Sequence, residues 1–263
     1  MEEQRKCFLE PGKIYHENGK SVLVFGVAKR PTEVGTFYDG IGIDLETGKV
    51  EQVYEFSHEV YKFSELNPTQ LENFSHFYSI YRRMSNKGVI AISGKARSGK
   101  DTLADKIIES GYNVRKAALG DPIKDIYRTL YGEMVWKDRL KLILIGQGLR
   151  EKDPHIWVKV WLRKAVDCFA YHENVRIVVP DVRQPNEFSF FQSLGAQTVL
   201  IKADEEKRRE ILRKVDGEKA LDEKLLNDET ELHVDTFDAD FIIFNNYDEK
   251  YEEEMIEVIE RLQ

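Results

Sequence analysis

Short apolar runs broken by turn residues dominate the first 66 residues of the chain. The two longest runs, residues 20–31 and 37–56, are rich in Val, Ile, Phe and Tyr, which favour strands. The turn signals among these runs are Gly35, Asp39-Gly40 and Thr47-Gly48. The pattern predicts a small, mostly antiparallel β unit over residues 1–66.

The spacing of apolar residues then changes from that of strands to that of a helix. Asn67-Pro68 is typical of a helix start, and apolar side chains follow at intervals of three and four residues: Leu71, Phe74, Phe77, Tyr78 and Tyr81. We predict a helix over 68–84 that packs its aromatic stripe into a core. Residues 1–87 therefore form a small β-rich unit with a linking helix, and the sequence assigns it no function.

Strand and helix signals alternate from Gly88 to the end of the chain. The predicted strands are 89–93, 113–118, 175–180, 197–203 and 240–245. The predicted helices are 100–110, 121–131, 137–151, 155–172, 185–194, 204–216 and 248–262. This alternation predicts an α/β domain over residues 88–263, with a five-stranded parallel sheet flanked by helices and ligands at the carboxyl ends of its strands.

Composition and charge narrow the classes of partner. The 263 residues are 41% hydrophobic and carry a formal net charge of −8, which disfavours nonspecific binding to nucleic acid or to an anionic membrane. Cys7 and Cys168 lie far apart without metal-ligand spacing, and no apolar run approaches the length of a membrane span. We expect neither nucleic acid nor membrane as a partner, and a cytoplasmic location.

The segment GKARSGKDT is the strongest chemical signal. It follows a predicted strand, opens a predicted helix and fits the phosphate-loop pattern, in which backbone N–H groups surround phosphates and Lys100 reaches the β- and γ-phosphates. Asp101 stands where that pattern has Ser or Thr, so either Asp101 or Thr102 faces a Mg²⁺ ion. The predicted ATP-binding loop is Gly94, Lys95, Ala96, Arg97, Ser98, Gly99, Lys100, Asp101 and Thr102. The alternative is a chance Gly-Lys turn before a helix.

Two further segments supply polar groups near the same sheet edge. VRIVVPDVRQPNEF brings Asp181 and Arg183 to a strand end, where a carboxylate suits Mg²⁺ and an arginine can fork onto a phosphate. A strand-ending cap and a surface arginine remain the alternative. In LILIGQGLREKDPHIWVKVW, Gln147 and Arg150 share a helix face, whereas Trp157 fits core packing and a pocket wall equally well.

These three segments resemble phage-type deoxynucleoside monophosphate kinases, a group within the P-loop nucleoside monophosphate kinases, over residues 88–263. The resemblance implies catalytic roles for Lys100, Arg150 and Arg183. It implies a monophosphate site formed by Gln147, Arg150, Trp157, Asp181, Arg183 and Glu187. It also implies metal ligands among Asp101, Thr102 and Asp181, lid arginines Arg209 and Arg213 that close over ATP, and Asn245 beside the adenine.

The expected activity is transfer of the γ-phosphoryl group of ATP, with Mg²⁺, to a deoxynucleoside monophosphate. The alternatives are a P-loop kinase for another small acceptor, of the dephospho-coenzyme A or phosphomevalonate type, and a noncatalytic ATP-binding switch. If the protein is phage-encoded, its location is the host cytoplasm. The oligomeric state is left open, with a homodimer as one alternative. We expect residues 88–263 to keep phosphoryl transfer when expressed alone, provided that the predicted helix over 68–84 is not needed to cover an apolar face.

Overall fold

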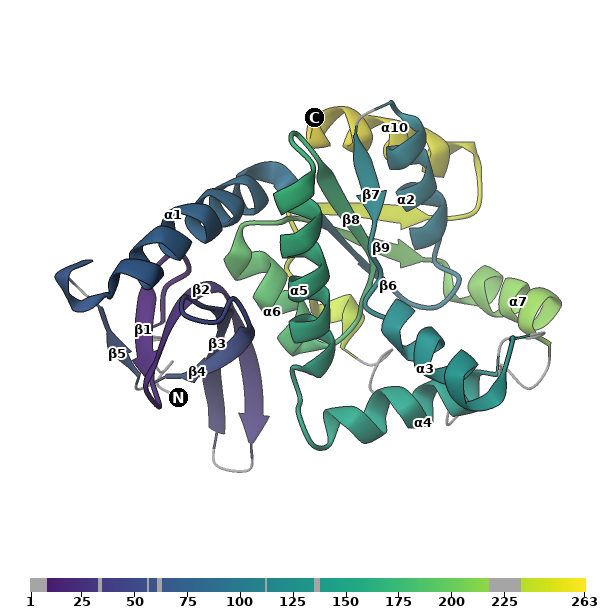
Figure 1. The fold of residues 1–263 in the computed structure, drawn as a ribbon. Coiled ribbons are helices and arrows are strands. Elements are labelled where there is room, and N and C mark those ends of the chain that lie inside the picture. The colour runs from purple at the N-terminus through teal and green to yellow at the C-terminus, as the bar shows by residue number, and fades with distance from the viewer. Residues whose placement is uncertain are drawn as a thin grey trace.

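The computed structural model describes residues 9–32, 35–55, 57–60, 63–111, 113–134, 138–217 and 233–263. It contains two five-stranded sheets joined by a long helix (Figure 1). Within the described residues, no helix is both long enough and apolar enough to cross a membrane.

The N-terminal sheet is antiparallel, as predicted. Its strand order is β4-β3-β2-β1-β5. The strands are β1 (Ile14–Glu17), β2 (Lys20–Thr32), β3 (Gly35–Asp44), β4 (Val50–Tyr54) and β5 (His58–Glu59). A short 3-10 helix, η1 (Phe63–Glu65), follows them.

One of the predicted turns is wrong. Thr47-Gly48 does turn the chain between β3 and β4, where the Gly48 N–H donates to the Asp44 carbonyl. Asp39-Gly40, however, lies inside β3 and pairs with β2 and β4. The glycine is there for space, because a Cβ on Gly40 would lie 2.8 Å from a methyl carbon of Val53. A glycine that is needed for its small size cannot be told from a turn glycine by sequence alone.

The linking helix forms where the apolar spacing predicts it. Helix α1 spans Pro68–Arg83 and begins with a capping box, in which the Asn67 and Gln70 side chains each accept a hydrogen bond from the other's backbone N–H. Its aromatic stripe faces the core, and the Tyr81 ring contacts Phe25 of β2 edge-on. A π-helical turn, η2 (Met84–Gly88), leads from α1 into the second sheet.

The second sheet is parallel, with strand order β10-β9-β6-β8-β7. Its strands are β6 (Val89–Gly94), β7 (Val114–Lys116), β8 (Arg176–Val182), β9 (Gln197–Ala203) and β10 (Phe241–Asn245). Its helices are α2 (Lys100–Glu109), α3 (Asp121–Tyr131), α4 (Arg139–Arg150), α5 (Ile156–Tyr171), α6 (Pro185–Leu194), α7 (Glu205–Asp216) and α10 (Glu249–Leu262), and a short η4 (Val234–Thr236) precedes β10. The predicted fold class, a helix-flanked parallel sheet with a small β-rich N-terminal unit, is confirmed.

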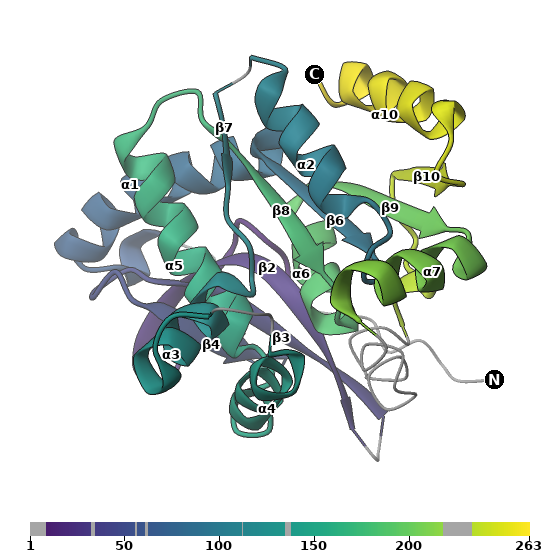
Figure 2. The ribbon, with the colours of Figure 1, turned by 90° about the vertical axis from the view of Figure 1, so that its right-hand side faces the viewer.

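Central strand β6 separates two layers of helices (Figure 2). Ile90 and Ile92 point into a core with α2 and α10, whereas Val89 and Ala91 point into a core with α5 and α6. Strands β8 and β9 lie on opposite sides of β6, so the order in which successive strands are added across the sheet reverses at β6. A ligand site is therefore expected at the carboxyl end of β6.

The N-terminal sheet shares its core with the second layer. Phe25 of β2 and Phe190 of α6 belong to one buried cluster, and the hydroxyls of Ser189 and Ser193 accept hydrogen bonds from the backbone of β2. Removal of residues 1–87 would expose this face of α6 to water. This packing argues against our expectation that residues 88–263 act alone.

The substitution Gly26→Ala tests the shared core. A Cβ on Gly26 would lie 2.6 Å from the Phe190 ring and 2.8 Å from its carbonyl oxygen. We expect the variant to lose about 1–3 kcal/mol of unfolding free energy in urea titrations, because the backbones must move apart. Gly148→Ala is the control, since Gly148 lies in exposed helix with nothing within 4 Å, and there alanine is expected to stabilise slightly. Equal stability of Gly26→Ala and wild type would mean that the two units do not pack as described.

Candidate active site

The predicted phosphate loop lies between β6 and α2 and needs both of its glycines. Gly94 has φ 153° and Gly99 has φ 104°, values that favour glycine. A Cβ on Gly94 would lie 2.8 Å from the Ile201 carbonyl oxygen, and one on Gly99 would lie 2.9 Å from the amide nitrogen of Asn245. The loop ends at the N-terminus of α2, where backbone N–H groups attract anions.

Lys100 starts α2 with its side chain folded back over the loop. The side chain is buried, lines the cavity beside the loop, and donates from Nζ to the Lys95 carbonyl oxygen at 2.6 Å. This position places a positive charge where the phosphates of a bound nucleotide would lie. The geometry therefore suits the role that the sequence predicts for Lys100.

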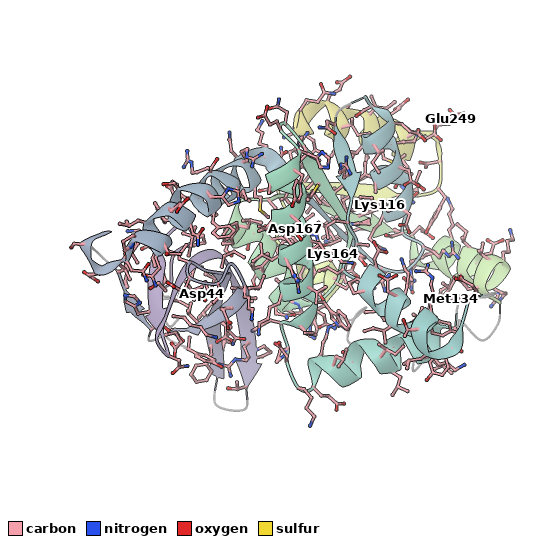
Figure 3. All side chains as sticks on the ribbon, viewed as in Figure 1. Asp44, Lys116, Met134, Lys164, Asp167 and Glu249 are labelled. Atoms are coloured by element: carbon pink, nitrogen blue, oxygen red, sulfur yellow. The ribbon has the colours of Figure 1, made fainter. Side chains whose placement is uncertain are left out.

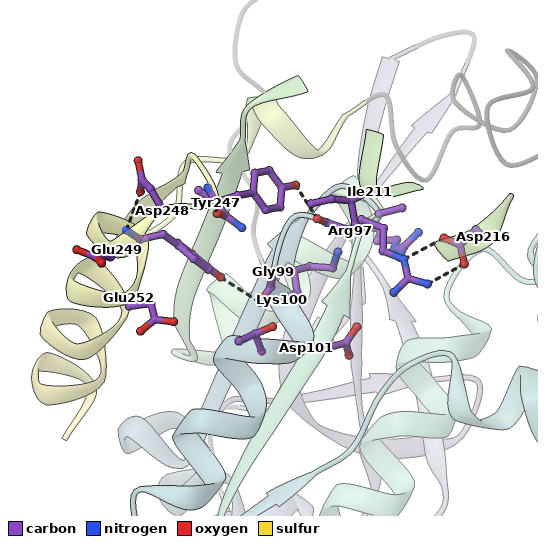
Figure 4. Close-up of a pocket in the computed structure, with 15 residues that line it drawn as sticks. Arg97, Gly99, Lys100, Asp101, Ile211, Asp216, Tyr247, Asp248, Glu249 and Glu252 are labelled. Atoms are coloured by element: carbon purple, nitrogen blue, oxygen red, sulfur yellow. Dashed lines mark hydrogen bonds and ion pairs between the residues drawn. The ribbon is translucent and has the colours of Figure 1, made fainter. Parts of the chain in front are cut away.

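Three side chains, from the end of β10, the segment after it and the first turn of α10, donate hydrogen bonds to carbonyl groups of the loop, and Figure 4 shows that of Tyr247. The contacts are Asn245 to the Ser98 carbonyl at 2.8 Å, Tyr247 to that of Arg97 at 2.8 Å, and Tyr251 to that of Gly99 at 3.1 Å. Burial raises the pKa of both tyrosines, that of Tyr247 to about 12, so their hydroxyls remain donors. Asn245 was predicted to lie near adenine; it lines the cavity, but its side chain also supports the loop.

Arg208 of α7 reaches the loop. Its buried guanidinium donates to the Ala96 carbonyl at 2.9 Å and forms an ion pair with Glu205. Arg209 pairs with the same carboxylate from an exposed position. The hydrogen bonds from Arg208 and Arg209 lower the pKa of Glu205 to about 2. The lid role of Arg209 and Arg213 stays a prediction.

Arg208→Met and Arg209→Met form a matched pair that separates these roles. Both remove a cation from Glu205, but only the first removes a hydrogen bond to the loop. We expect Arg208→Met to raise the KM for ATP about tenfold, roughly the value of one charge-assisted hydrogen bond, and Arg209→Met to change it less than twofold. A larger effect of Arg209→Met would favour the predicted lid.

Arg97 joins the loop to the other end of α7. Its guanidinium makes two hydrogen bonds to Asp216, at 2.9 Å and 2.7 Å, and they raise the pKa of Arg97 above its ordinary value (Figure 4). This fork closes one side of a cavity of about 770 Å³. The cavity is lined by the loop and by residues from α7, β10 and α10, including Thr102, Ile211, Asp248, Glu249 and Glu252.

A second cavity, of about 320 Å³, is lined mainly by residues from β7, α3, α4, the end of β8 and α6. Its apolar lining comes from Leu119, Ile123, Leu142 and Ile143, and its cations are Lys116, Lys124, Arg150 and Arg183. Gln147, which we predict to belong to the monophosphate site, lines the same cavity. The combination suits a ligand with a flat apolar part and an anionic group.

The two cavities meet at the start of α2. Asp101 and Arg183 line both of them. Lys116, at the carboxyl end of β7 (Figure 3), lies 3.4 Å from a carboxylate oxygen of Asp101 and 3.1 Å from one of Asp105. Sequence reasoning missed Lys116, although the rule that ligands gather at the carboxyl ends of parallel strands would have selected it.

Asp181 lies near the end of β8 and organises the wall of the second cavity. Its carboxylate accepts hydrogen bonds from the N–H groups of Leu119 and Gly120, both at 2.8 Å. Burial raises the pKa of Asp181 even though these two bonds act in the opposite direction. The carboxylate therefore holds the β7–α3 connection and lines the predicted substrate site at once.

Arg150 and Glu187 form an ion pair in the second cavity. The Arg150 Nη2 atom lies 2.7 Å from Glu187, whose other oxygen accepts the backbone N–H groups of Arg183 and Gln184, each at 3.0 Å. Glu187 is 2% exposed, so its charge depends on these partners. The Nε atom of Arg150 is buried and has no hydrogen-bond partner among the described residues. An anion in the cavity would supply one.

Trp157 lies behind the cavity wall. It is 2% exposed, and its indole N–H donates to the Gly146 carbonyl at 3.1 Å. Of the two interpretations of Trp157, core packing fits the structure, and the residue supports α4 from below.

A divalent ion has ligands available at the junction of the cavities. Asp101 and Thr102 both line the first cavity, and Asp181 lines the second. The described residues hold no group of three or more His, Cys, Asp or Glu that would bind a metal by themselves. Mg²⁺ does not need such a group beside a nucleotide, because one or two protein oxygens complete a shell of phosphate oxygens and waters.

Comparisons with known proteins give distant similarities. No family model matches the chain, and no curated protein matches it. Among solved structures, TT1252 from Thermus thermophilus is similar with a TM-score of 0.40 and 19% identity, over 66% of this chain and 96% of that one. The dephospho-CoA kinase from Campylobacter jejuni gives 0.39 and 14%, over 67% and 97%, and APE1195 gives 0.38 and 18%, over 66% and 93%. Similarity at this level carries no argument about activity, which rests on the site itself.

Proposed function

We propose that the protein is an ATP-dependent P-loop kinase that transfers the γ-phosphoryl group to a deoxynucleoside monophosphate and releases the diphosphate. The observation that carries the proposal is the meeting of two cavities at Asp101 and Arg183. A nucleoside triphosphate held by the loop in the first cavity would present its terminal phosphate to the phosphate of an acceptor bound in the second cavity. In-line transfer requires that arrangement.

The chain's own groups offset charge and fix position. The Lys100 ammonium binds the β- and γ-phosphates together with the loop N–H groups, and Arg150 and Arg183 bind the acceptor phosphate from the other side. Two polyanions then approach one another with their repulsion reduced. The attacking atom is already a phosphate oxygen, so the reaction needs little acid–base help.

Mg²⁺ would be held by Asp101 or Thr102 together with phosphate oxygens, with Asp181 as a further ligand. Bound there, the ion would neutralise charge on the transferring phosphate. Asp101 and Thr102 lie in the first turn of α2 and line the cavity where ATP is proposed to bind.

The acceptor base is proposed to lie against Leu142 and Ile143, with its polar edge at Gln147. A side-chain amide both donates and accepts, as the edge of a nucleobase requires. The preference for a deoxyribose comes from the family resemblance. The apolar lining near Leu119 is compatible with it, because a ribose hydroxyl placed there would lose its water.

A coupled assay for ADP tests the proposal. The protein is incubated with ATP, Mg²⁺ and one acceptor at a time, from deoxynucleoside monophosphates, ribonucleoside monophosphates, dephospho-coenzyme A and phosphomevalonate. We expect at least one of dTMP, dGMP or dCMP to give a higher kcat/KM than its ribo counterpart, or than UMP in the case of dTMP. Activity on a non-nucleotide acceptor alone would refute the proposed acceptor, whereas the proposed kinase activity would stand. ATP binding without transfer to any acceptor would favour a switch.

A further inference from the structure

A buried aspartate of the N-terminal sheet begins a series of hydrogen bonds that leads to the helices around the second cavity. Asp39, in the middle of β3, is fully buried, and its carboxylate faces two basic side chains. Arg30 of β2 donates to it from Nε at 2.6 Å and from Nη2 at 3.2 Å, and Nε2 of His155 lies 2.9 Å from Oδ2. Burial alone raises the pKa of Asp39, but the hydrogen bonds from His155 and Arg30 outweigh it and lower the pKa below its usual value. The carboxylate is therefore a buried anion that depends on its partners.

The chain of hydrogen bonds continues from His155 into α6. His155 immediately precedes α5 and is fully buried, and its Nδ1 lies 3.2 Å from the amide nitrogen of Asn186. That amide nitrogen also donates to the Pro154 carbonyl at 2.8 Å. Because an amide nitrogen only donates, Nδ1 accepts and the proton sits on Nε2, where it is donated to Asp39.

A second contact from the N-terminal sheet holds the connection between α4 and α5, to which His155 belongs. Gln52 of β4 accepts a hydrogen bond from Lys159 at 2.7 Å, and Lys159 pairs with Asp153 at 3.0 Å. Two neighbouring strands of the sheet, β3 and β4, therefore hold the α4–α5 connection, residues 151–155.

This connection adjoins both members of the ion pair in the second cavity. Arg150 is the last residue of α4 and precedes the connection directly, while Glu187 follows Asn186 in α6. A shift of the connection away from α6 would pull the Arg150 guanidinium away from Glu187. The two ends of the 2.7 Å ion pair are thus fixed relative to one another by groups that the N-terminal sheet orders.

We infer that the N-terminal β unit is a positioning element of the acceptor site, in which Asp39, acting through His155 and Asn186, holds Arg150 and Glu187 in the arrangement that receives the acceptor phosphate. The ligand's identity rests on the proposed function, whereas the mechanical link does not. Asp39, His155 and Asn186 are positioning residues. The inference gives residues 1–87 a role that their β pattern alone does not suggest.

Four substitutions in the full chain test the inference. Asp39→Asn removes the charge that Arg30 and His155 face. His155→Phe removes both of its hydrogen bonds, whereas His155→Gln places an amide N–H where Nε2 donates. Asp44→Asn is the matched control: Asp44 is also a buried aspartate of β3 (Figure 3), but within the part of the chain that the structure describes its carboxylate accepts hydrogen bonds only from the local Glu46 and Thr47.

Two measurements on each variant separate positioning from general destabilisation. The first is the KM for the acceptor against that for ATP. We expect Asp39→Asn and His155→Phe to raise the acceptor KM about tenfold and the ATP KM less than twofold, because only the acceptor wall shifts. His155→Gln is expected to recover most of the loss, and Asp44→Asn to change neither constant. A folded Asp39→Asn variant with wild-type KM values, or with equal increases in both, overturns the inference.

The second measurement, amide hydrogen exchange, does not depend on activity. We expect residues 139–160 to exchange faster in Asp39→Asn than in wild type, with α2 unchanged, and no such difference in Asp44→Asn. If wild type transfers phosphate to no acceptor, the proposed function fails, and exchange alone then decides the link. Faster exchange confined to residues 139–160 supports it, and unchanged or uniformly faster exchange overturns it.

Discussion

We expect Lys100→Ala to lower kcat by about 10²-fold or more, which corresponds to roughly 2.7 kcal/mol of lost transition-state stabilisation. The side chain is buried at the first turn of α2 and folded over the loop, so its ammonium is fixed where the proposed reaction would develop charge on the transferring group. Steady-state rates at saturating ATP and acceptor measure the effect. Circular dichroism and urea titration establish that the variant is folded.

Lys95→Ala is the matched control for this prediction. Lys95 lies in the same loop, but its ammonium forms an ion pair with Asp235 at 2.6 Å and lines a different cavity. We expect a loss of less than tenfold, because its backbone carbonyl still accepts the Lys100 hydrogen bond. Similar losses for the two variants would mean that loop charge in general, and not the position of Lys100, supports transfer.

The conformation of the glycine-bounded loop before α2 and the parallel sheet were predictable because their signals are local. A glycine at each end of the loop answers a backbone need that neighbouring residues cannot alter, and β6 is a continuous apolar run. The helix bounds follow from caps such as Asn67 before α1. Periodicity and capping act over a few residues, so one sequence contains them in full.

The contacts that the sequence did not indicate depend on distant partners. Arg208 and Arg209 are adjacent letters in one helix, and only the tertiary packing decides which of them meets Ala96. Gly40 looks like a turn until Val53 is known to lie against it. Contacts between residues more than a hundred positions apart, such as Asp39 with His155, leave no local pattern to find.

Arg150→Met is expected to have the second large effect, on acceptor use and on stability together. The substitution removes a charge that the acceptor phosphate would meet, worth about 10- to 10²-fold in kcat/KM for the acceptor. It also leaves Glu187 buried without its cation, which is expected to cost up to about 3 kcal/mol of unfolding free energy. The KM for ATP should stay within about twofold, because Arg150 lines only the second of the two cavities described above.

The double variant Arg150→Met with Glu187→Gln separates the two effects. Neutralising Glu187 removes the stranded charge, and its amide oxygen can still accept a backbone N–H from Arg183 or Gln184. We therefore expect stability to recover by about 1–2 kcal/mol while acceptor use stays low, a coupling that a double-mutant cycle measures. Recovery of acceptor kcat/KM together with stability would show that Arg150 acts on the fold and not on the phosphate. Equal losses for ATP and acceptor in the single variant would place Arg150 at the donor nucleotide instead.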